Sequence, residues 1–100
     1  MLIARALPTS LETLYTVGTS GTVTLKDVTI TNTNATPAAV TIHLVPAGDS
    51  AGTSNALFYA AAVPGNSTVQ WVGEQDLAAQ DTIQGLATLS GVSVLASGDI

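Results

Sequence analysis

The chain has 100 residues, a net charge of −5, no cysteine and only two basic residues, Arg5 and Lys26. Its length fits one domain, and a hydrophobic fraction of 46% is more than a disordered chain carries. The scarcity of cations excludes nucleic acid or an anionic membrane as a partner, and the lack of cysteine excludes disulfides, thiolate catalysis and cysteine metal sites.

The first element expected is an N-terminal arm, residues 1–10, ahead of a single domain that covers residues 11–100. Residues 1–7 are mostly apolar but lack the clean alternation of a strand in the domain's own sheet, and Pro8 ends them. We therefore expect the arm to dock on a neighbouring protein through Met1, Leu2, Ile3 and Leu7. The opening residues lack the order of a signal peptide, and no apolar run reaches the ~20 residues of a membrane span, so neither export nor membrane insertion is expected.

Glycine, proline and asparagine punctuate the rest of the chain at the short intervals that are typical of an all-β domain. No helix-length amphipathic pattern competes with the strands. In chain order, the expected strands cover residues 12–17, 22–32, 38–45, 57–63, 67–72, 82–89 and a last one from residue 92.

The strand at residues 22–32 changes phase part-way along. Val23 and Leu25 are odd-numbered, whereas Val28 and Ile30 are even-numbered. Since side chains alternate between the two faces of a strand, one residue near Lys26 must break the count. The pattern predicts a β-bulge there, which would bend the strand between two sheets.

A hairpin loop at residues 32–37 is expected to lead into the strand at residues 38–45, where alternation is clearest. That strand would point Val40, Ile42 and Leu44 into the core and Thr41 and His43 outward. His43 is the only histidine, and the chain has no cysteine and no second histidine to complete a triad or a zinc site. A surface or interface position is the favoured interpretation for His43.

The strand at residues 57–63 is apolar at every position, so part of it must face away from the core. An outward aromatic on a charge-poor surface indicates a protein contact. We therefore count Leu57, Phe58 and Tyr59 as further interface candidates. Tyr15 and Trp71 are expected to anchor the core. An exposed Trp71 beside Tyr59 would instead indicate either a platform for stacking sugars or an energetically dominant residue of a protein interface.

The segment at residues 73–81 is acidic and is expected to contain a helical turn at 76–79. Glu74, Asp76 and Asp81 could ligate calcium, but they lack the spacing of a calcium loop. Capping by Asp76 and a turn at Asp81 are the favoured interpretations.

At the end of the chain, Ser90-Gly91 predicts a two-residue hairpin turn that pairs Leu89 with Val92 and Ala87 with Val94. Together these patterns predict one antiparallel β-sandwich of seven or eight strands, jelly-roll or immunoglobulin-like. No paired acid and base, metal ligand set or cofactor motif stands out, so we expect a protein without enzymatic activity, cofactor, metal or small-molecule substrate.

Several segments resemble a family of small β-sandwich proteins encoded among the virion genes of tailed bacteriophages. The similarity extends from about Tyr15 to Val94, and the segments that carry it are LYTV at 14–17, VTITNT at 28–33, VTIHLVPAG at 40–48, SNAL at 54–57 and DTI at 81–83.

The resemblance implies a structural protein of the phage particle. Among such components we expect a capsid decoration (cement) protein, commonly a homotrimer, that binds the major capsid protein on the outer head surface. A neck, tail or fibre component is equally compatible with the resemblance. Two other classes stay open, a carbohydrate- or receptor-binding module and a pilus-like subunit with residues 1–7 as donor strand. The protein would be made in the host cytoplasm without a signal peptide and would self-associate through residues 57–63.

Overall fold

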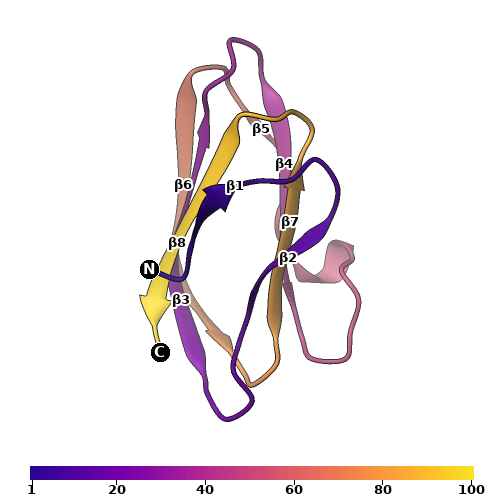
Figure 1. Ribbon diagram of the computed structural model, residues 1–100, viewed down its shortest axis with the longest axis vertical. Coiled ribbons are helices and arrows are strands. Elements are labelled where there is room, and N and C mark those ends of the chain that lie inside the picture. The colour runs from indigo at the N-terminus through magenta and orange to yellow at the C-terminus, as the bar shows by residue number, and fades with distance from the viewer.

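The computed structural model describes residues 1–100, which form eight strands and one short 3-10 turn in two antiparallel sheets packed face to face (Figure 1). The predicted all-β sandwich is confirmed. The elements are β1 (Ile3–Ala6), β2 (Glu12–Thr16), β3 (Val23–Asn32), β4 (Ala38–Val45), η1 (Thr53–Asn55), β5 (Ala56–Val63), β6 (Ser67–Leu77), β7 (Thr82–Ala87) and β8 (Val92–Asp99).

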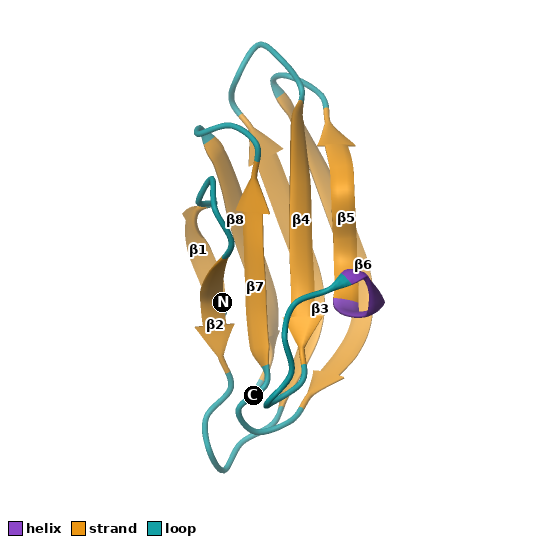
Figure 2. Ribbon diagram, turned by 90° about the vertical axis from the view of Figure 1, so that its right-hand side faces the viewer, coloured by secondary structure: helices purple, strands orange, loops and turns teal.

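The strand order nests the chain around one hairpin. Sheet A has the order β1-β8-β3-β6 and sheet B the order β2-β7-β4-β5. The first strand pairs with the last, the second with the seventh, the third with the sixth and the fourth with the fifth. The chain therefore forms one long antiparallel hairpin that is rolled up into two layers. This is the strand order of a jelly roll. In Figure 2 sheet B lies in front, with β1 and β2 at one side of the sandwich and β5 and β6 at the other.

The predicted bulge in β3 is confirmed. The pairing of β3 shifts register between Leu25 and Asp27 with both neighbours, β6 and β8. As a result Val23 and Leu25 before the bulge and the apolar residues after it are all buried. However, β3 stays between the same two strands throughout, so the predicted bend from one sheet to the other is wrong.

The two inner faces form a single apolar core. Most of its buried side chains are aliphatic, and Leu14, Tyr15, Leu57, Phe58, Val69 and Trp71 are partly buried against it. Tyr15 and Trp71 therefore pack on the core as expected. The largest fully buried aliphatic side chains are Leu25, Ile30, Ile42, Ile83, Val17, Val28, Val40, Val45, Val63, Val92 and Val94.

One buried amide joins the loops at one end of the sandwich. Asn32, at the end of β3, is fully buried, and its Nδ2 donates to the carbonyl oxygens of Thr36 and Val63, at 2.9 and 3.1 Å. Its Oδ1 accepts hydrogen bonds from the backbone N–H and the side-chain amide of Asn34, which in turn donates to Ser90 O. Because every polar atom of Asn32 is paired, the loops that leave β3, β5 and β7 are held together.

The expected separate arm is wrong. β1 pairs with β8 from Ile3↔Ala96 to Ala6↔Ser93, and Ile3 and Leu7 are buried in the core. The hydrogen bond from Leu7 N to Val92 O, at 2.7 Å, continues this pairing beyond the strand. The domain thus begins with β1, and a donor-strand role for residues 1–7 is excluded because they already complete their own sheet.

Three local expectations are also wrong. β7 and β8 belong to different sheets, as do β3 and β4, so neither Ser90-Gly91 nor the loop at residues 32–37 closes a hairpin. Both connections cross from one sheet to the other. The segment at 76–79 is not helical, since β6 continues to Leu77 and a turn follows.

We expect truncation of Leu7 to destabilise the protein, because its side chain is 3% exposed within the core. Leu7→Ala should lower the free energy of unfolding by about 2–5 kcal/mol, measured by urea denaturation. Leu11→Ala is the matched control, since Leu11 is 45% exposed. A Leu7 variant as stable as the Leu11 variant would contradict the placement of residues 1–7 in the sandwich.

The β3 bulge brings its backbone so close to β8 that position 98 has no room for a side chain. A Cβ on Gly98 would overlap Thr24 O and lie 3.0 Å from Leu25 Cα. Gly98→Ala should therefore destabilise the fold by about 1–3 kcal/mol. Gly18→Ala, whose Cβ would meet nothing within 4 Å, should change stability by less than about 1 kcal/mol. Equal melting temperatures for the two variants would contradict the bulge geometry.

Candidate interaction surface

The predicted interface residues do not form one patch. Ile3 and Leu7 are in the core, and Leu2, Leu57 and Phe58 are partly buried against it. Only Met1, 73% exposed, and Tyr59, 65% exposed, are largely open to solvent. Met1 precedes β1 and Tyr59 lies on β5, and these strands are at opposite sides of the sandwich (Figure 2).

The strand register specifies the composition of the outer face of sheet A, which includes two rows without a charged residue. Residues that pair across a sheet share a face, so the register identifies each row of neighbouring side chains that crosses the strands on this face. One row is Gln70, Thr29, Leu95 and Ala4, and the next is Thr68, Thr31, Ser93 and Ala6. Thr31 and Thr68 are hydrogen-bonded through their hydroxyls at 3.2 Å.

A third row of this face is Val72, Asp27 and Ser97, where a single carboxylate appears. Val72 is 73% exposed, although it is a large apolar residue. The outer face of sheet A is therefore a mixture of hydroxyl, amide and aliphatic groups. The sequence predicted a charge-poor surface but did not locate it on this sheet.

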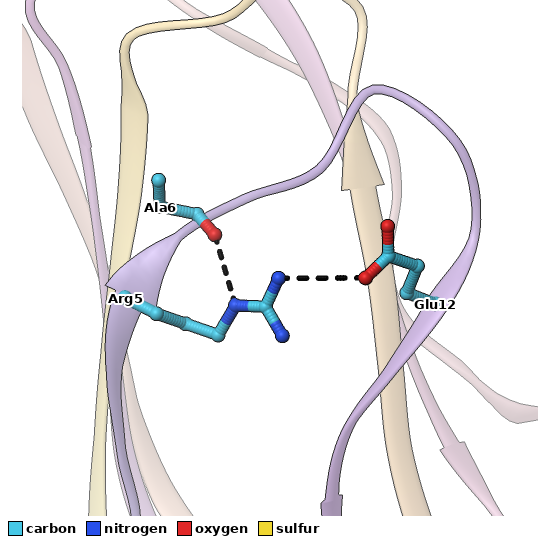
Figure 3. A network of polar contacts seen from close by, with 3 residues as sticks. All are labelled: Arg5, Ala6 and Glu12. Atoms are coloured by element: carbon cyan, nitrogen blue, oxygen red, sulfur yellow. Dashed lines mark hydrogen bonds and ion pairs between the residues drawn. The ribbon is translucent and has the colours of Figure 1, made fainter.

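One ion pair joins the two layers at the β1/β2 side. Arg5 Nη2 lies 3.5 Å from Glu12 Oε1, and Arg5 Nε donates to Ala6 O at 3.1 Å (Figure 3). Since β1 belongs to sheet A and β2 to sheet B, this pair bridges the two sheets at one edge of the sandwich. It thus places one of the two cations away from the uncharged rows.

The other cation lies at the β3 bulge. Lys26 Nζ lies 2.8 Å from Asp99 Oδ2 on β8. The hydrogen bond and the charge of Lys26 lower the pKa of Asp99, and the same contact raises the pKa of Lys26. Close by, Thr24 donates to Asp76 Oδ1 at 2.9 Å, so Asp76 bonds across the sheet instead of capping a helix. Apart from Asp27, the charges of sheet A gather at this end and at the β1 edge.

His43 is covered rather than exposed. It lies on the outer face of sheet B, opposite Gln84, but is only 6% exposed. Its Nδ1 is 2.9 Å from Asn55 Oδ1, which also accepts from Gly52 N, while Asn55 Nδ2 donates to Ser50 O. The predicted outward direction agrees with this register, but the predicted surface position is wrong because the loop between β4 and β5 covers the ring.

The acidic residues of 73–81 bind separate partners. Asp81 accepts from Ala47 N and Ala78 N, both at 2.8 Å, which gives it the turn role expected from the sequence. No group of three or more histidine, cysteine, aspartate or glutamate residues is placed to hold a metal ion. None of the helices is long and apolar enough to cross a membrane.

The surface has two shallow hollows, both open to solvent. One is lined by Thr22, Thr24, Asp76, Leu77 and Ala78. The other is lined by residues of β4, β5 and the loop between them, together with Gln75. In the first, the Thr24 hydroxyl donates to Asp76 Oδ1 at 2.9 Å, and neither hollow is lined by a histidine, a lysine or a cysteine. The broad outer face of sheet A therefore remains the strongest candidate for a functional surface.

Comparison of the chain with protein-family models, with curated proteins and with solved structures gave no match.

Removal of the Lys26 side chain should raise the pKa of Asp99 toward its ordinary value of 3.8. Because the folded-state pKa of Asp99 is lowered, the pair stabilises the protein above that ordinary value, and this contribution is lost as the pH falls through the folded-state pKa. An NMR titration of the Asp99 carboxyl carbon in Lys26→Met measures the shift. Arg5→Met, which removes the other cation, should leave Asp99 unchanged; an equal shift in both variants would contradict a specific pair.

Proposed function

We propose that this protein is a non-enzymatic structural subunit of a tailed-phage particle. In this proposal it is a capsid decoration protein that binds the major capsid protein through the outer face of sheet A. Two features support the assignment: the resemblance described above and the chemistry of this face. The proposal adds no cofactor, metal or small-molecule substrate.

The observation that carries the proposal is the near-absence of charge on three rows of a continuous sheet. Docking such a face removes few ions from water, so the desolvation penalty is small. Thr29, Thr31 and Ser93 offer hydroxyl groups that both donate and accept hydrogen bonds. Leu95 and Val72 add exposed apolar area, which favours burial against another protein.

The jelly-roll strand order is compatible with this role but does not select it. Jelly rolls occur both in viral capsid proteins and in lectins, and a fold by itself does not define a function. A sugar-binding module usually presents several exposed aromatic rings together. Here Trp71 and Tyr15 pack on the core, and only Tyr59 is strongly exposed. A neck, tail or fibre position would use the same uncharged face.

A charge introduced on the face should weaken particle binding. Thr29 lies on β3, between β6 and β8, and is flanked by Gln70 and Leu95. We expect Thr29→Lys and Thr29→Asp each to reduce the amount of chain that co-sediments with particles lacking it, by at least about tenfold. Thr13→Lys, at an exposed position of sheet B, is the control and should bind as the unaltered chain does.

Two outcomes would contradict the proposal. If purified particles of the encoding phage do not contain the chain by mass spectrometry, the virion assignment fails. If the Thr13 variant loses binding while both Thr29 variants keep it, the docking face is not that of sheet A. Copy number distinguishes the positions, since hundreds of copies per particle favour the head surface and a dozen or fewer favour the neck or tail.

A further inference from the structure

The sandwich has four strands at the edges of its sheets, and they differ in how well they are protected. The edge strands are β1 and β6 in sheet A and β2 and β5 in sheet B. An edge strand presents unpaired N–H and C=O groups, which can pair with another strand. Natural proteins block such edges with short strands, bulges, charges or proline.

Three of these edges carry such devices. β1 has four residues, and its Arg5 forms the ion pair with Glu12. β2 has five residues and an irregular register between Thr13 and Tyr15. β5 pairs irregularly with β4, and Ala60 has a left-handed φ of 47° within this irregular stretch.

β6 carries none of them over its first half. It is the longest strand, with 11 residues, and its register with β3 is unbroken from Ser67 to Val72. This stretch contains no proline and no charged residue, and Thr68, Gln70 and Val72 are exposed. No backbone hydrogen bond joins β6 to any strand other than β3.

We propose that β6 is a pairing edge, which binds β6 of a second copy of the chain in antiparallel orientation. The two sheets A then join into one eight-stranded sheet across a two-fold axis, as in an isologous dimer. The interface consists of main-chain hydrogen bonds along residues 67–72, flanked by cross-strand side-chain contacts on both faces.

Charge selects the direction of this pairing. Glu74 and Asp76 follow the uncharged stretch on the same strand. In an antiparallel pair along residues 67–72 the acids of the two copies lie beyond opposite ends of the paired stretch, so they do not face each other. A parallel pair would place acid against acid at a few ångströms, which is destabilising. The two copies are thus complementary in one direction only.

A second feature lies on the same side of the sandwich. β5 and β6 are the neighbouring edge strands at this side (Figure 2), and Tyr59 of β5 is 65% exposed. Tyrosine is enriched at the buried centres of protein interfaces. Pairing through β6 brings this side of both sandwiches together. Tyr59, one of the interface candidates, therefore lies on the side that faces the second copy and can add buried area to the dimer interface.

The test uses the purified chain alone, so its result is independent of the phage assignment. Sedimentation equilibrium at micromolar concentration should give twice the chain mass of 10.0 kDa. Gln70→Lys, which lies near the middle of residues 67–72 and therefore places like charges close to each other across the two-fold axis, should weaken dimerisation by at least about tenfold. Leu95→Lys, on the same outer face but on β8, should leave the dimer intact.

Disulfide trapping gives a direct geometric readout because the chain has no cysteine of its own. Among the single variants Thr68→Cys, Gln70→Cys and Val72→Cys, at least one should form a covalent dimer on mild oxidation, and Leu95→Cys should form none. A monomer at all micromolar concentrations overturns the proposal. A closed trimer, the state implied by the family resemblance, also overturns it. In a two-fold pair the β6 edge of each copy is occupied by the other copy, so no β6 edge is left for a third copy. Cross-linking through Leu95→Cys alone overturns it as well.

Discussion

The bulge at Lys26 is the constraint on which the rest of sheet A depends. β3 is the only strand of that sheet with buried residues in two phases, and the extra residue lets both phases face inward. Without it, either Val23 and Leu25 or Val28 and Ile30 would point to solvent. Burial of these four side chains thus requires a local break in the hydrogen-bond ladder and a glycine at position 98 of β8. It also leaves Lys26 exposed, where it pairs with Asp99.

The alternation of apolar residues predicted this bulge because a phase change within one strand is a local signal. The same reasoning failed at Ser90-Gly91. A tight turn between two apolar strands looks alike whether the strands pair in one sheet or face each other across the core, since both arrangements bury the same side of each strand. Ala87 and Val94 are buried in both cases. Only the strands that pair with β7, which are β2 and β4, and with β8, which are β1 and β3, decide between the two arrangements.

The surface was harder to predict than the core. Composition required a charge-poor exterior, but the outer rows of sheet A exist only once β6, β3 and β8 are side by side, and those pairings join residues far apart in the chain. His43 shows the same limit. Its outward direction followed from alternation, whereas its burial depends on how the loop between β4 and β5 folds back. The alternation of residues along a strand gives its facing directions but does not predict which loop will cover it.

The nested strand order has a consequence for how the chain folds during synthesis. β1 pairs only with β8, so the first strand to leave the ribosome must wait for a strand that begins at Val92. At roughly 5–20 residues per second, translation keeps β1 unpaired for several seconds, with Ile3 and Leu7 exposed. Only β4 and β5 are neighbours both in sequence and in a sheet, so theirs is the one pairing that needs no strand from a distant part of the chain.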